Sequence, residues 1–260
     1  MRVPKFSVGQ PTRRMEDIGL LTGNGCYSDD FRYPDEVHAV FVRSAVAHAD
    51  IGAPDISSAL EVPGVLTVLT GQDWKDEGLG ELNGSGFFGI LDPKRRDGQD
   101  WFRPIRLPLA VGRVRYLGEP IAVVVAETQN AARDAAELVD IPYNPLPIVT
   151  DTAEANAPGT VQIYDDCERN ESFVYEVGDK DATDLAFSSA PLVIKQKFVI
   201  NRMYASPIEP RSVLARYNAP NGKYEIKVGA QSPNDLRRSF GTMMLKVDPN
   251  NILSNCSPPL

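Results

Sequence analysis

The sequence predicts an α+β protein of two domains. Three observations support this: runs of β-branched residues typical of strands, segments with helical periodicity, and a proline-broken stretch between the two halves. The strongest strand pattern is Ile121–Ala126, and the helical patterns are Gln129–Val139 and Pro233–Leu245. The stretch 141–149 contains three prolines, which confine it to a sheet edge or a linker. We place a domain boundary near it.

The first half contains further elements with clear local signals. Val37–Arg43 is predicted to be a buried strand, and Val65–Leu69 a second strand. Asp55–Leu60 is predicted to be a short helix that stops before a Pro-Gly pair. The segment Gln72–Pro108 contains six glycines, and a loop of this length usually carries function or mobility.

The second half begins with a loop-rich stretch over 150–190. We expect a strand at Leu192–Ile200 and a hairpin formed by Ser212–Tyr217 and Tyr224–Val228. The last helix should expose Leu236, Phe240 and Met244 of its apolar stripe unless something covers them. Ile252 and Leu253 could begin another strand, but nothing is left for it to pair with, so the chain looks cut rather than finished.

Composition excludes several classes of protein. The 260 residues carry a net charge of −8 with no basic stripe, which argues against a nucleic-acid partner. Three cysteines lie far apart, which fits neither a disulfide framework nor a zinc site and favours a reducing, cytoplasmic location. The N-terminus lacks the apolar region of a signal peptide, and the longest apolar run is too short to span a membrane.

Familiar catalytic motifs are weak or missing. Residues 84–89 match G-x-G-x-x-G, but no strand precedes the match and no helix follows it, so a flexible loop is favoured over a dinucleotide site. The two histidines, His38 and His48, are expected in a strand and near a turn rather than in a hydrolase triad. The acid pairs Asp29-Asp30 and Asp165-Asp166 are most simply solvated loop charges.

Two polar positions stand out from this background. Glu209-Pro210-Arg211 places charges in an otherwise apolar stretch, which fits an ion pair or backbone clamp, or alternatively a catalytic role. Gln231 lies between a predicted strand and a predicted helix. Its amide can both donate and accept, so it suits either an ordinary loop contact or a contact with an oxo ligand or a substrate carbonyl.

Several runs, taken in order and spacing, then point to one family. They extend from residue 8 to about residue 253, and Val114–Val124 is the most recognisable. The others are Val8–Asp17, Leu20–Gly23, Gly25–Asp30, Arg43–Ile51, Ala135–Val139, Tyr143–Pro147 and Pro207–Arg211. The chain resembles the large subunits of molybdenum hydroxylases, the group of xanthine dehydrogenase, aldehyde oxidase and carbon monoxide dehydrogenase. It departs from the family pattern at Ala45 and Val46, where a proline and a histidine are usual.

The resemblance implies a fold and a domain order. Residues 1–19 would be an N-terminal extension, and residues 20–147 an aldehyde oxidase/xanthine dehydrogenase-type α/β hammerhead domain. Residues 148–260 would be an incomplete first molybdopterin-binding α+β domain.

The resemblance also implies a chemistry. Such enzymes hydroxylate an aldehyde, N-heterocycle or similar C–H substrate with oxygen derived from water. The implied cofactors are molybdenum-molybdopterin, in the cytosine dinucleotide form, with [2Fe-2S] and FAD on partner subunits or domains. The implied partners are an iron–sulfur subunit, a FAD subunit and, for a split enzyme, the missing C-terminal part of the large subunit.

Only one site residue transfers to this chain. Gln231 matches the glutamine that lies beside the apical oxygen of molybdenum in the family, and no catalytic base or metal ligand can be assigned. We therefore expect an oxidoreductase subunit that is inactive alone. The alternative is a non-catalytic hammerhead interaction module that docks to flavin or iron–sulfur subunits.

Overall fold

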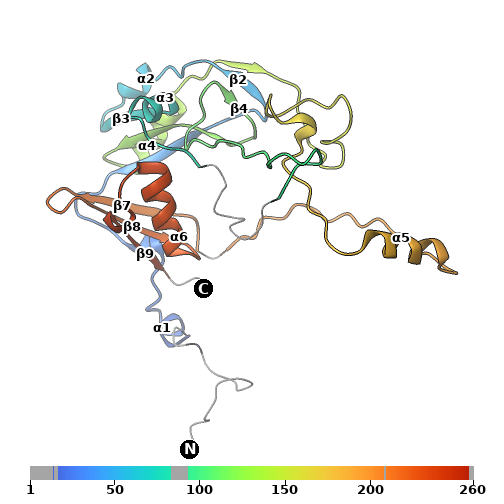
Figure 1. The fold of residues 1–260 in the computed structure, drawn as a ribbon. Helices are drawn as coiled ribbons and strands as arrows, with labels where there is room; N and C mark the ends of the chain where they lie inside the picture. The colour runs from blue at the N-terminus through green and yellow to red at the C-terminus, as the bar shows by residue number, and fades with distance from the viewer. Residues whose placement is uncertain (1–13, 15–16, 83–92, 208, 258–260) are drawn as a thin grey trace, which may run out of the picture. The chain divides into compact units, whose positions relative to one another are not determined.

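The computed structural model describes residue 14 and residues 17–82, 93–207 and 209–257 (Figure 1). The chain divides into two compact units, each built from segments that are distant in sequence. The terminal unit comprises Met1–Pro34, Ser206–Arg237 and Asn250–Leu260, and the central unit comprises Asp35–Ala205 and Arg238–Pro249.

The first sheet of the central unit has β5 (Pro120–Ala126) in its middle. Its edges are β1 (His38–Arg43) and β3 (Val65–Thr70), both antiparallel to β5. The run of β-branched residues in β5 favours a strand, and Val124 is completely buried. The predicted strands of the first half are therefore confirmed.

Helix α4 (Gln129–Glu137) packs against this sheet, and α2 (Ser57–Leu60) packs against α4 and β3. Thr128 caps α4, because its Oγ1 accepts a hydrogen bond from the N–H of Ala131 at 3.2 Å. The core formed here contains Val42, Ala59, Val68, Ala122, Val124, Ala126, Ala132, Ala135 and Val139.

One prediction for this sheet was wrong. β1 is not buried on both sides: its residues alternate between more and less exposed positions, since only one face packs on the core. On the other face, Phe41, Val123 and Leu69 form a row across the three strands, and Phe41 is 45% exposed.

A second small sheet has the order β4-β2-β6, with bounds Arg113–Val114, Ala49–Ile51 and Tyr143–Pro145. β6 lies at its edge, as the prolines of the 141–149 stretch predict. Ile121 is fully buried against β2 and β4 and extends the core beneath this sheet.

The segment predicted as one long loop begins with a helix, α3 (Gly71–Asp76). Thr70 and Asp73 form a capping box at its start, with reciprocal side-chain and backbone bonds. The G-x-G-x-x-G match at 84–89 lies outside the described residues.

The terminal unit contains a three-stranded sheet of order β7-β8-β9, whose strands lie side by side in Figure 1. β7 (Val213–Asn218) and β8 (Lys223–Gly229) form the predicted hairpin. β9 (Ile252–Ser257) pairs in parallel with β8, so the expectation that a strand beginning at Ile252 has no partner was wrong. Two short helices, α1 (Asp17–Leu21) and η1 (Ser28–Asp30), precede the sheet in sequence.

The predicted last helix has two parts, α6 (Pro233–Arg238) and a π-helical segment, η3 (Ser239–Leu245). The apolar stripe is covered, an outcome that the prediction left open: Met244 is only 6% exposed, and Leu236 and Phe240 are half-buried. Within the central unit the carbonyl of Met244 accepts the N–H of Gly80 at 2.7 Å, and Lys246 Nζ donates to the carbonyl of Gly78.

Residues 175–207 are all exposed. They contain α5 (Lys180–Ser189), which lies in the stretch predicted as loop, and no strand at Leu192–Ile200. The remaining elements, η2 (Glu168–Asn170) and η4 (Pro249–Asn251), are single turns. No helix in the described ranges has both the length and the apolar character needed to cross a bilayer.

Candidate functional site

Gln231 lies in the turn between β8 and α6 of the terminal unit. The strand ends at Gly229, and Pro233 begins the helix, because a proline fits the first turn where its missing N–H is not needed. Ser254 Oγ donates to the carbonyl of Pro233 at 3.1 Å, which ties β9 to the start of α6. The predicted strand-to-helix junction is therefore present, and Gln231 is in it.

The side chain of Gln231 is exposed, and it forms no hydrogen bond with any residue in the described ranges. A glutamine amide carries two donor hydrogens and an acceptor oxygen, and it remains neutral at all ordinary pH values. Such a group can contact an oxygen ligand without adding charge. The amide of Gln231 is therefore available to bind such a ligand.

Glu209 of the Glu-Pro-Arg run is held by a backbone clamp. Its Oε1 accepts hydrogen bonds from the N–H of Ser28 at 2.9 Å and from Ser28 Oγ at 3.0 Å. Ser212 Oγ lies 2.6 Å from Ser28 Oγ. Of the alternatives left open by the sequence, the structure favours the clamp, since Glu209 forms no ion pair within the described part of the chain.

The two histidines are in different structural settings. His48 is 3% exposed, and its Nδ1 lies 2.7 Å from the carbonyl oxygen of Pro147. His38 begins β1, an edge strand. His48 therefore makes a structural contact, as expected for a histidine near a turn.

Each acid pair includes at least one residue with a defined partner. Asp30 accepts the N–H of Tyr27 at 2.7 Å within the capped turn η1. Asp165 is bound by Arg113 at 2.8 Å, and Arg113 also pairs with Asp50 at 2.6 Å. The first contact lies within a turn, and Arg113 ties the turn of Asp165 to the sheet that contains β2 and β4.

Burial raises the pKa of three groups in the central unit, Glu119, Cys167 and Tyr116. The pKa of Glu119 is raised above its ordinary value, chiefly because burial disfavours the charged carboxylate. Burial likewise raises the pKa of the Cys167 thiol, which therefore lacks the lowered pKa of a reactive cysteine.

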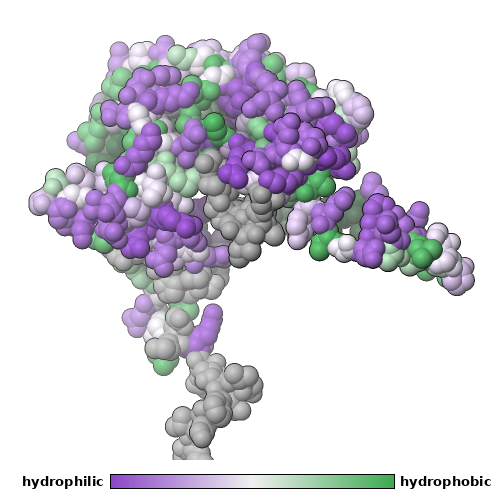
Figure 2. Space-filling view, viewed as in Figure 1, coloured by the Kyte–Doolittle hydropathy of each residue, from purple (hydrophilic) through white to green (hydrophobic). Residues whose placement is uncertain are grey.

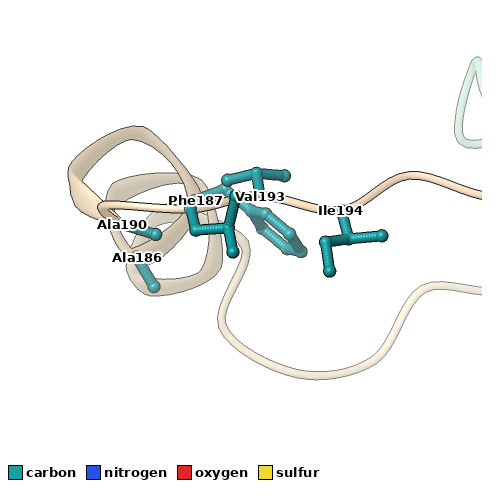
Figure 3. Close-up of a pocket in the computed structure, with 6 residues that line it drawn as sticks. Ala186, Phe187, Ala190, Val193 and Ile194 are labelled. Carbon is teal, nitrogen blue, oxygen red and sulfur yellow. The ribbon is translucent and has the colours of Figure 1, made fainter.

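An apolar hollow of about 230 Å³ lies beside α5 (Figure 3). Phe187 of α5 points toward Val193 and Ile194, which follow the helix in the chain. Figure 2 also shows hydrophobic residues at the surface of the segment that carries α5. The lining contains no charged or amide side chain, so it lacks the convergent polar groups of an active site.

Sequence reasoning missed the contact between Ser28 and Glu209. The two residues are 181 positions apart, and no local pattern links them. The only available signal was a glutamate in an apolar stretch, which needs a partner that its neighbours do not supply.

Family models match most of the chain. A model described as "Aldehyde oxidase and xanthine dehydrogenase, a/b hammerhead domain" matches residues 22–147. A second, described as "Molybdopterin cofactor-binding domain", matches residues 163–258. These matches confirm the predicted fold class, a hammerhead domain followed by the start of a molybdopterin-binding domain.

Relatives and solved structures agree with these models. The chain is 36% identical to the 6-hydroxypseudooxynicotine dehydrogenase complex subunit gamma of Paenarthrobacter nicotinovorans, over 80% of this chain and 25% of that protein. It is 31% identical to the carbon monoxide dehydrogenase large chain of Afipia carboxidovorans, over 88% of this chain and 28% of the relative. The structure of quinoline 2-oxidoreductase from Pseudomonas putida 86 is similar with a TM-score of 0.78 and 29% identity, covering 97% of this chain and 30% of the other.

Proposed function

Because the chain belongs to the aldehyde oxidase and xanthine dehydrogenase family of molybdenum hydroxylase large subunits, we propose that it forms part of a molybdopterin-binding subunit. The complete enzyme would hydroxylate a C–H carbon of an aldehyde, N-heterocycle or similar substrate with oxygen derived from water. Residues 1–19, 20–147 and 148–260 would be its extension, hammerhead domain and first part of the cofactor-binding domain.

The observation that carries this proposal is the place of Gln231. The turn that carries it lies inside the region matched by the molybdopterin-binding model, and its amide is exposed and unpartnered within the described residues. An amide hydrogen donor fits an oxygen ligand on a metal. When bound, the molybdenum–pterin group would supply the redox chemistry, and Gln231 would orient it from one side.

A complete molybdenum site needs residues other than Gln231. The chain spans about a quarter of the length of its curated relatives, 25% and 28% in two cases. We propose that the remaining walls of the pocket, including the base, come from sequence outside this chain, so that the chain alone is inactive. Those relatives are named as a complex subunit and a large chain, which supports the presence of partner subunits. We propose that these partners are an iron–sulfur subunit with [2Fe-2S] and a flavin subunit with FAD.

Two finer assignments complete the proposal. The pterin is proposed to be the cytosine dinucleotide form. The protein is proposed to act in the cytoplasm, and the free thiols of Cys26 and Cys167 are consistent with a reducing compartment.

The proposal is tested by measuring molybdenum and turnover together. The chain is produced alone, and also with the remaining large-subunit sequence and the iron–sulfur and flavin subunits. The assembly should contain about one molybdenum per copy of this chain and place oxygen from isotope-labelled water into the product. The chain alone should contain none.

Either of two results would overturn the proposal. One is stoichiometric molybdenum and turnover in the isolated chain, which would contradict its incompleteness. The other is product oxygen that derives from dioxygen in the assembled enzyme, which would contradict the reaction class.

A further inference from the structure

The carboxylate of Glu209 ends a chain of hydrogen bonds in the terminal unit. Ser28 donates both its N–H and its hydroxyl proton to Oε1 of Glu209. Because a serine hydroxyl has one proton, Ser212 must be the donor in its 2.6 Å contact with Ser28 Oγ. Ser28 is 2% exposed, while Glu209 and Ser212 are partly buried, so the bonds are shielded from water at their Ser28 end.

The other side of the same carboxylate lies against Gly229. A Cβ at residue 229 would lie 3.0 Å from Glu209 Oε2 and 3.1 Å from its Cδ. Gly229 has no left-handed backbone angle, so glycine serves here for close approach rather than for its φ, and a Cβ would require the carboxylate to shift by a few tenths of an ångström. Gly229 ends β8, two residues before Gln231.

The anchor of Glu209 is itself held in place. Ser28 belongs to η1, which packs on β7 and β8. Two residues near η1, Phe31 and Tyr33, lie beneath the ammonium of Lys227, whose Nζ is 3.8 Å and 5.4 Å from their ring centroids. Glu209 is therefore hydrogen-bonded to an N-terminal segment that packs on the sheet, and its carboxylate lies in close contact with the end of β8.

We propose that Glu209 is a positioning residue, which fixes the turn carrying Gln231 by bridging Ser28 and Gly229. Its effect on the metal rests on the function proposed above. The bridge itself belongs to the chain and can be measured without metal.

Hydrogen exchange on the full chain tests the bridge. Glu209→Ala removes the acceptor, so the amide of Ser28 and the peptide spanning 229–232 should exchange about tenfold faster or more. Glu209→Gln should keep exchange near the wild-type rate, because its amide oxygen still accepts both bonds. Glu225→Ala is the matched control: Glu225 is on β8 and pairs with Arg216 at 3.2 Å, and its loss should leave both segments unchanged.

A second variant tests the bridge from its other end. In Gly229→Ala the new methyl group displaces the Glu209 carboxylate, so the amide of Ser28 should exchange faster although it lies in a remote segment of sequence. If Gly229 had only a local packing role, the exchange rate of the Ser28 amide would not change. This variant, with Ser28→Ala, keeps the test decisive if Glu209→Ala does not fold.

Three results would overturn the bridge: unchanged exchange at 229–232 in Glu209→Ala, equal defects in the Ala and Gln variants, or an unchanged Ser28 amide in Gly229→Ala. In the assembled enzyme, Glu209→Ala should lower molybdenum content and Glu209→Gln should retain it. If the wild-type assembly also lacks molybdenum, the proposed function fails, while the exchange result still decides the bridge.

Discussion

Glu119 is a carboxylate that folding partly buries at the start of β5. Its Oε2 accepts the N–H of Arg115 at 2.5 Å, but burial outweighs this bond and raises the pKa above the ordinary 4.5. The folded state therefore binds the proton more tightly than the unfolded state. Ionisation weakens the fold, and stability should fall as pH rises from 4.5 through the raised pKa.

We predict that Glu119→Gln removes this part of the pH dependence. The amide keeps an acceptor for the N–H of Arg115 and cannot ionise. Urea unfolding across this pH window should show a smaller loss of stability in the variant than in wild type. The exposed Glu176→Gln serves as control, and an identical pH profile for wild type and Glu119→Gln would contradict the prediction.

Single residues differ in how far sequence can predict their roles. The place of Gln231 followed from a strand pattern before it and a Ser-Pro start after it. The partner of Glu209 could not be predicted in this way, because a buried serine in a remote segment carries no local signal. Long-range polar contacts of this kind are set by tertiary packing.

At the scale of elements, α4 depends on its N-cap. Thr128→Ala removes the acceptor for the N–H of Ala131 and should lower the free energy of unfolding by about 1 kcal/mol. The check is chemical denaturation of the central unit, followed by circular dichroism. Thr152→Ala, at an exposed position outside helices, should change stability by much less. Equal losses in the two variants would refute the capping argument.

The contact between the loop after α3 and the end of η3 depends on Gly80. A Cβ at residue 80 would lie 1.6 Å from the carbonyl oxygen of Met243, and a backbone atom cannot move aside as a side chain can. Gly80→Ala should therefore destabilise the central unit by roughly 1–3 kcal/mol, the usual cost of overpacking. Gly19→Ala, where nothing lies within 4 Å, is the control, and thermal unfolding is the measurement. A Gly80→Ala variant as stable as wild type would contradict this contact.

Elements with strong local patterns were predictable. β5, α4 and the β7–β8 hairpin follow from β-branched runs, a cap and a turn. The strand expected at Leu192–Ile200 is absent because extended residues become a strand only when they pair. β9 is the reverse case: its short pattern gave no visible partner, but the chain returns after α6 and η3 and places β9 beside β8.

At the scale of the whole molecule, each unit joins segments that local patterns treat separately. The terminal unit combines residues from the beginning, the middle and the end of the chain. Periodicity and turn signals describe neighbours in sequence, so they cannot reveal this assembly. The order and spacing of the runs that resemble the family could reveal it, because they reflect a family fold rather than a local preference.

The central claim is that this chain contributes one side of a molybdenum site through Gln231. The most direct measurement is the molybdenum content of the assembled enzyme with Gln231→Ala, beside Gln129→Ala, which changes an exposed glutamine of α4. The account predicts that Gln231→Ala loses molybdenum while its circular dichroism spectrum is unchanged, and that Gln129→Ala retains the metal. Unchanged molybdenum and turnover in Gln231→Ala would contradict it.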